Sequence, residues 1–347
     1  MKPSKTLRPA GQVPSTGLLL LGAAAALAAL AAGNQLLARR AERRHPAHGK
    51  FIEVDGVRLH YLEAGSGAPV VLIHGNGVAA EDFVVSGLFD RLGARHRVIA
   101  FDRPGFGYSD RPRSRIWTAT AQAELLAGAL DRIGVGRATV IGHSWGTLVA
   151  LRLALQRPER VAGLGLISGY YWPTPRLDVP MMSGPAIPGA GDILRFTLSP
   201  LLGRLMAPVL FRQLFSPAKV TEAFKAGFPT SMALRPGQIR ASAGDTALMP
   251  VEAMKLSKLY KEIACPVVLI AGEGDKIASY RHQSAKLARA LGWELHTVHG
   301  AGHMAHHTAL PEVAAELETL ITRVEATPAT RSPEVAGAPL EGVSASL

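Results

Sequence analysis

Short apolar runs alternate with longer amphipathic stretches along residues 51–169. Apolar runs of about four to eight residues, bounded by turn residues, are typical of strands buried on both faces. Amphipathic stretches between such strands predict helices packed against them. The alternation therefore predicts a mostly parallel sheet with helices on both faces. Strands are expected at residues 51–54, 58–63, 70–73, 97–101, 138–141 and 161–167, and helices at 119–133 and 147–156.

The alternation is lost between residues 170 and 262, where prolines and glycines interrupt the chain. This stretch predicts a mainly helical insertion, which we call the cap. At the start of the chain, Asp55-Gly56 is a turn signal that predicts a hairpin between the first two strands. The remaining expected elements are cap helices at 193–214 and 221–226, strands at 267–270 and 294–298, and helices at 280–291 and 312–324.

One α/β domain with an eight-stranded sheet, interrupted by the cap, fits a chain of 347 residues. The last residues are rich in Pro, Ala, Ser and Gly, a composition that predicts disorder. The expected parts are a basic tail (1–17), a transmembrane anchor or signal peptide (18–38), a juxtamembrane linker (39–50), the core (51–169 and 263–325), the cap (170–262) and a disordered tail (326–347).

Residues 18–38 consist mainly of Leu and Ala, and no charged residue lies between Arg8 and Arg39. As a helix this segment is long enough to cross a hydrocarbon core of roughly 30 Å. A cleaved signal peptide is the alternative, because Ala29-Leu30-Ala31 offers a small-residue cleavage site. The basic cluster directly after the segment favours an uncleaved single-pass anchor, while basic residues on both flanks leave the side of the membrane open.

The chain has 38 Lys and Arg against 27 Asp and Glu, a net charge of +11. Such an excess attracts nucleic acids or anionic membranes. No nucleic-acid recognition motif is present, and part of the excess flanks the apolar segment, which indicates lipid headgroups and no nucleic-acid partner. The single cysteine, Cys265, excludes an intramolecular disulfide and is expected at a strand edge. The flanking basic residues are Lys2, Lys5, Arg8, Arg39, Arg40, Arg43 and Arg44.

A Gly-x-Ser-x-Gly motif stands between the fifth expected strand and the helix after it. The chain must turn so sharply there that glycines are needed, and the serine is left strained with its hydroxyl exposed. Ser144 is therefore the candidate nucleophile, the alternative being an ordinary serine in a glycine-rich loop. His143 is expected to have a packing role. The motif reads Gly142-His143-Ser144-Trp145-Gly146.

A serine hydroxyl becomes a strong nucleophile only when a neighbouring base takes its proton. Of 12 histidines, His303 is the best placed, because it lies between glycines in the loop after the last expected strand. His306 and His307 are weaker candidates and are expected in a solvated stretch. Asp275, after strand 267–270, is the candidate acid that orients the base, with Glu273 as its rival in the same loop.

The oxyanion that develops during acyl transfer needs backbone donors that are already in place. One is expected to be the amide of Trp145, at the start of a helix whose dipole favours negative charge. The second is expected to be the amide of Asn76, in the loop after strand 70–73. That loop reads His74-Gly75-Asn76-Gly77, and its alternative role is purely geometric.

The chain resembles the α/β-hydrolase superfamily over roughly residues 51–324. The resemblance includes residues 101–110, Phe-Asp-Arg-Pro-Gly-Phe-Gly-Tyr-Ser-Asp, which are similar to the family's stretch after the fourth strand. It implies a helical cap over the active site and hydrolysis through an acyl-enzyme, without metal or organic cofactor. Asp102 in this stretch is expected to brace the loop.

The residue at the nucleophile position separates relatives within that superfamily. Haloalkane dehalogenases and epoxide hydrolases resemble this fold but carry aspartate there, so Ser144 points away from both. The favoured function is hydrolysis of a small or lipid-derived ester. Aminopeptidase, amidase and perhydrolase activities remain alternatives, as does a non-catalytic ligand-binding protein.

Apolar residues of the cap are expected either to pack within it or to accept an acyl chain. They are Phe196, Leu201, Leu202, Leu205, Met206, Leu210, Phe211 and Phe215.

Overall fold

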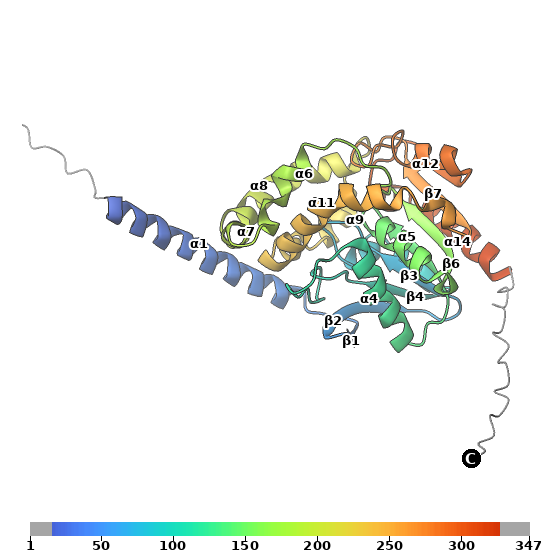
Figure 1. Cartoon of the computed structure of the whole chain (residues 1–347), viewed down its shortest axis with the longest axis horizontal. Helices are drawn as coiled ribbons and strands as arrows, with labels where there is room; N and C mark the ends of the chain where they lie inside the picture. The colour runs from blue at the N-terminus through green and yellow to red at the C-terminus, as the bar shows by residue number, and fades with distance from the viewer. Residues whose placement is uncertain (1–15, 327–347) are drawn as a thin grey trace, which may run out of the picture.

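The computed structural model describes residues 16–326 and is built around an eight-stranded sheet (Figure 1). The strand order is β1-β2-β4-β3-β5-β6-β7-β8, with β2 antiparallel to both neighbours and all other pairs parallel. The predicted α/β fold with a mostly parallel sheet is confirmed. The strands are Lys50–Val54, Val57–Ala64, Pro69–Ile73, Arg97–Phe101, Ala138–His143, Val161–Ile167, Val267–Gly272 and Glu294–Val298.

Burial explains why these segments are strands. Every residue of β5 and β6 is buried, as expected for central parallel strands covered on both faces. The β1–β2 hairpin turns at Asp55 and Gly56, whose φ angles of 50° and 73° suit the two central positions of a type I′ turn. The Asp-Gly pair therefore sets the register of the first hairpin, with Val54 opposite Val57.

Helices cover the two faces of the sheet and form two cores. One core packs α4 and α5 against the sheet, and the other packs α2, α3 and α14 against the opposite face. Because parallel strands end at the same edge of a sheet, the loops that follow β3, β5, β7 and β8 meet at that edge. The helices of the core are α2 (Glu81–Val85), α3 (Leu88–Gly93), α4 (Ala119–Arg132), α5 (Gly146–Gln156), α12 (Ser284–Leu291), α13 (Ala305–Thr308) and α14 (Leu310–Ala326).

The chain between β6 and β7 is helical. The single helix expected at 193–214 is instead two, because the backbone breaks at Thr197, whose hydroxyl donates to the Ile193 carbonyl at 2.7 Å. The longest cap helix, α11, was not expected. The cap helices are α6 (Asp178–Ser183), α7 (Ala190–Phe196), α8 (Leu198–Phe215), α9 (Glu222–Gly227), α10 (Thr230–Ala233) and α11 (Pro236–Leu256).

An N-terminal helix, α1 (Thr16–Arg44), projects from the body (Figure 1) and is long and apolar enough to cross a membrane. It continues into the expected linker, residues 39–50, because its last turns contact the cap. Asn34 donates to the carbonyls of Phe196 and Thr197 at 2.9 and 2.8 Å. The expected tails at 1–17 and 326–347 lie almost wholly outside the described residues.

The apolar cap residues divide into two groups. Phe215 is buried and Phe211 is partly buried, in a small cluster with Phe224 and Met304. In contrast, the side chains at four of the other positions point into solvent, so the expectation that they pack inside the cap is wrong. They are Leu201, Leu202, Leu205 and Met206, which are 44%, 54%, 68% and 46% exposed.

Candidate active site

Ser144 occupies the sharp turn between β5 and α5. Its φ of 51° is one of three positive values among the described residues other than glycine. The turn depends on close backbone approach, because a Cβ at Gly146 would lie 2.1 Å from the Ile73 carbonyl oxygen. A Cβ at Gly142 would similarly lie 2.7 Å from the Gly146 oxygen. The two glycines therefore permit a conformation that costs the serine strain and presents its hydroxyl.

His303 and Asp275 come from the loops after β8 and β7 and meet Ser144. Nε2 of His303 lies 2.9 Å from Oγ of Ser144, and Nδ1 of His303 lies 2.8 Å from Oδ2 of Asp275. The other carboxylate oxygen of Asp275 accepts the amides of Ile277 and Ala278 at 2.8 and 3.0 Å. These bonds fix the carboxylate, so a proton on Nδ1 is favoured and Nε2 is left to accept the serine proton.

The rival acid in the same loop faces elsewhere. Glu273 is exposed, and its carboxylate contacts Nδ1 of His299 at 3.0 Å. The three residues that the structure brings together are thus the three expected ones, Ser144, Asp275 and His303.

The two expected oxyanion donors belong to the loop after β3 and to the residue that follows Ser144. The amides of Asn76 and Trp145 form no hydrogen bond within residues 16–326, so both are available to a ligand. The loop passes close to the serine, since a Cβ at Gly75 would lie 3.1 Å from Cβ of Ser144. The side chain of Asn76 donates to Thr246 of α11 at 2.9 Å, which ties this loop to the cap.

Comparison with known proteins identifies the family of this chain. A family model described as the alpha/beta hydrolase fold matches residues 68–310, a range that includes Ser144, Asp275 and His303. The chain belongs to this family. The N-terminal helix lies outside the matched region.

Three relatives illustrate what this α/β hydrolase is similar to. The 2-hydroxymuconate semialdehyde hydrolase of Pseudomonas putida is 36% identical over 127 residues, covering 37% of this chain and 45% of that protein. A thermophilic esterase from Thermogutta terrifontis superposes with a TM-score of 0.64 at 23% identity, over 80% and 99% of the two chains. A membrane phospholipase A, described as a bacterial virulence factor, superposes with a TM-score of 0.61 at 23% identity, over 90% and 98%. The chain spans about half the length of the curated relatives it matches first.

A buried ion pair that sequence reasoning missed joins the loop after β3 of this α/β hydrolase, where one oxyanion donor is expected, to the cap. Arg103 donates to the carbonyls of His74 and Gly75, both at 2.9 Å, and pairs with Asp245 of α11. Both side chains are fully buried. Asp245 also pairs with Arg111 at 2.9 Å, and its carbonyl accepts the indole N–H of Trp145 at 2.9 Å. The pair therefore connects both oxyanion segments to one cap helix.

Asp102 braces the loop after β4. Its Oδ2 lies 2.7 Å from Nδ1 of His60 and accepts the amide of Tyr108 at 2.9 Å, while Oδ1 accepts the amide of Ala80 at 2.9 Å. A Cβ at Gly107, where φ is +51°, would collide with this carboxylate. The contacts are those of a structural residue. A cavity of about 270 Å³ lies beside Asp102, next to the end of α1. Ser144, Asp275 and His303 do not line this cavity.

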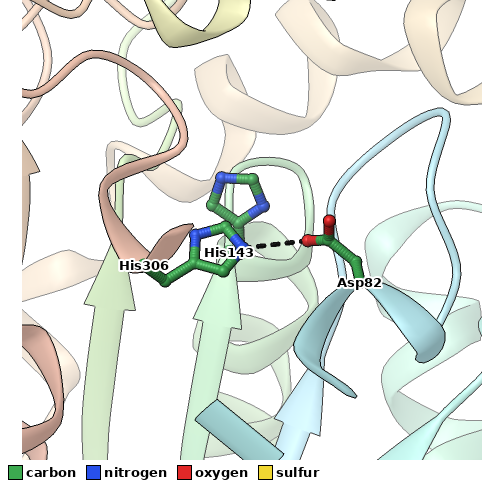
Figure 2. A group of neighbouring side chains, drawn as sticks. All are labelled: Asp82, His143 and His306. Atoms are coloured by element: carbon green, nitrogen blue, oxygen red, sulfur yellow. Dashed lines mark hydrogen bonds and ion pairs between the residues drawn. The ribbon is translucent and has the colours of Figure 1, made fainter. Parts of the chain in front are cut away.

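A buried cluster of histidines around Asp82 adjoins the base (Figure 2). Nε2 of His306 and Nε2 of His307 each lie 2.9 Å from a different oxygen of Asp82. The expectation that these histidines are solvated is wrong, because α13 turns back against α2. Ligand atoms of Asp82, His143 and His306 lie within 4.8 Å of one another, a spacing that suits a metal ion. The two imidazole N–H groups already satisfy the carboxylate, however, and His143 contacts the His303 carbonyl at 3.2 Å, so we interpret the cluster as support for the base.

Burial makes this region sensitive to acid. Burial lowers the pKa of His74 to about 3 and lowers the pKa values of His143 and His306, so the folded state favours their neutral forms. Histidines in the unfolded chain take up protons below about pH 6.5. The stability contributed by neutral burial is complete above that pH and is lost as the pH falls toward the folded pKa values. We expect His74, whose folded pKa is about 3, to cost about 1.4 kcal/mol between about pH 7.5 and about pH 5.5, and His143 and His306 to add to the loss in the same direction.

Urea unfolding of the full chain in detergent at these two pH values tests this expectation. His306→Gln, which can still donate to Asp82, should reduce the pH dependence by one histidine's share, whereas His282→Gln at an exposed position should not. Equal stability at both pH values would contradict the assignment.

Proposed function

We propose that this protein is a serine hydrolase that forms an acyl-enzyme on Ser144 and hydrolyses a small or lipid-derived carboxylic ester. The observation that carries the proposal is the continuous contact from Ser144 Oγ through the His303 imidazole to Asp275, at 2.9 and 2.8 Å. Each atom in that contact has the role that acyl transfer requires. A serine in this position supports an ester hydrolase over the aspartate chemistry of dehalogenases.

In the proposed reaction, His303 Nε2 takes the Ser144 proton as Oγ attacks the ester carbonyl. The tetrahedral oxyanion accepts hydrogen bonds from the amides of Asn76 and Trp145. His303 then gives the proton to the departing alcohol oxygen as the carbon–oxygen bond breaks, leaving the acyl group on Ser144. Water then attacks the acyl carbon as the same histidine takes its proton, and the histidine gives that proton to Ser144 Oγ as the bond to Oγ breaks and the carboxylic acid leaves.

The similarity to a 2-hydroxymuconate semialdehyde hydrolase supports a second candidate, hydrolysis of such a semialdehyde. The same nucleophile, base and oxyanion donors would serve that reaction. A panel that includes both acyl esters and 2-hydroxymuconate semialdehyde separates the two.

We propose that α1 anchors the enzyme in a membrane by a single pass. The apolar part of the helix supports this, since its side chains are almost all exposed and no part of the described chain covers them.

A fluorophosphonate reporter, which labels activated serines, tests the nucleophile. Membranes that contain the full chain should be labelled, and Ser144→Ala should abolish labelling. Ser257→Ala, at a half-buried serine directly after α11, should not. Labelling that persists in Ser144→Ala would reject the proposed nucleophile.

A further inference from the structure

The cap helix α8 carries a stripe of exposed apolar side chains. The positions fall at i, i+3, i+4, i+7, i+8 and i+11 from the first of them, so they occupy one side of the helix. Such a stripe is usually the buried side of an amphipathic helix, but here it faces away from the protein. We call it the α8 face, and it consists of Leu198, Leu201, Leu202, Leu205, Met206 and Val209, which are between 43% and 68% exposed.

The rest of α8 is held by the protein. Pro200, Ala207 and Phe215 are buried against the cap and the core. The helix is thus oriented, and the exposure of the opposite side is not the result of a detached segment. Single exposed leucines are common, but a continuous apolar patch on an ordered helix marks a contact surface.

The position of α1 identifies the surface that the α8 face meets. Asn34 binds the carbonyls of Phe196 and Thr197, at the break between α7 and α8. The apolar residues of α1 before Asn34 extend outward from this point, and α7 and α8 lie on the side from which α1 projects (Figure 1). A bilayer that holds those residues therefore begins at the level of α8.

The composition of α8 also fits a lipid interface. The helix contains Arg204 and Arg212 and no acidic residue, and α1 ends with four further arginines, the first of them five residues after Asn34. Together α7 and α8 are apolar enough for a membrane segment, but they meet at 56°, which suits helices lying along a surface. Basic residues beside an apolar stripe favour anionic headgroups.

We propose that the α8 face lies in the interfacial layer of an anionic phospholipid bilayer, the same bilayer that α1 enters. The inference rests on the proposed anchoring by α1 and gives the cap a second membrane contact. It places the proposed hydrolase on the surface from which a lipid-derived ester would come.

Depth-dependent quenching tests the contact in the full chain. In a Cys265→Ser background, a single fluorophore is attached at Leu205→Cys or, as a control, at Thr319→Cys on α14, an exposed position outside the cap. The proteins are reconstituted in vesicles of phosphatidylcholine and phosphatidylglycerol. Nitroxide-bearing lipids should quench the fluorophore at position 205 and not at 319, and iodide in the water should do the opposite. Equal quenching at both positions would overturn the proposal. Quenching at position 205 that changed with the number of protein molecules per vesicle would also overturn the proposal, because a second copy of the protein would then cover the α8 face.

A set of substitutions separates this inference from the proposed activity. In Leu201→Ser/Leu205→Ser/Met206→Ser, turnover of an ester embedded in vesicles should fall about tenfold or more, because apolar area no longer enters the interface. Turnover of a soluble short-chain ester should not change, and α1 should keep the protein in the pellet after carbonate extraction. Met254→Ser, at a 49% exposed position on α11, is the matched control. An unchanged rate on vesicles would reject the α8 contact. If the unsubstituted protein did not hydrolyse the soluble ester, the hydrolase proposal would be rejected. The quenching result would still decide whether the α8 face contacts the bilayer.

Discussion

Asp275→Asn should lower kcat for ester hydrolysis by about 10⁴-fold while the protein stays folded. Oδ2 of Asp275 faces Nδ1 of His303 at 2.8 Å, and the carboxylate is held by two backbone amides. An asparagine amide in that position would donate to Nδ1 and place the imidazole proton on Nε2. The nitrogen of His303 that faces Ser144 would then carry a proton, so it could not accept the serine proton until it had lost its own. Steady-state kinetics on the preferred ester, with a thermal unfolding curve for each variant, measures this effect.

The neighbouring carboxylate is the control for that substitution. Glu273→Gln alters the same loop, but Glu273 contacts His299 on the surface. Its kcat should stay within about twofold of the parent, because the exposed pair makes little contribution to structure. If Glu273→Gln lost activity and Asp275→Asn kept it, the assignment of the acid would be wrong.

Asp245→Ala should destabilise the protein by about 3–5 kcal/mol, because it leaves the buried guanidinium of Arg103 without its carboxylate. Activity should fall as well, since Arg103 also holds the carbonyls of the oxyanion loop. Urea unfolding measures the change in stability. The change in activity is measured as kcat/KM at a temperature where the variant is folded.

An exposed pair in the same cap provides the comparison for Asp245→Ala. The Asp192 side chain is 31% exposed and pairs with Arg113, which is 56% exposed, and with the more buried Arg195, so solvent screens its charge far more than it screens Asp245. Asp192→Ala should therefore cause a far smaller loss of stability and leave kcat/KM unchanged. Equal losses in the two variants would show that burial of the Arg103 pair has no special importance.

The core strands and the meeting of three candidate site residues were predictable because their signals are local. Three strands, among them Val161–Ile167, begin and end at the expected residues, since apolar runs bounded by turn residues define them. Ser144, Asp275 and His303 each follow an expected strand, and parallel strands bring the loops after them to one edge of the sheet. Topology thus converts three separate local patterns into one site.

The features that were missed depend on contacts between distant residues. The partner of Arg103 lies in the cap, and no pattern near either residue marks it. His306 is buried because α13 meets Asp82, more than two hundred positions away in sequence. Helical spacing identifies the apolar side of α8 but does not say whether protein or solvent meets it, so the exposure of Leu205 had to come from the structure.

Where α1 attaches decides which part of the enzyme a bilayer would immobilise. The helix contacts α7, α10 and α11, and two of its polar residues bind the cap, Asn34 at the α7–α8 break and Glu42 at Arg235. Within residues 16–326, the chain passes from α1 into the core through the short stretch after Arg44, where the His48 carbonyl contacts His60 of β2. If α1 lies in a membrane as we propose, the bilayer therefore holds the cap directly, and in any opening between the two the core would move relative to a fixed cap.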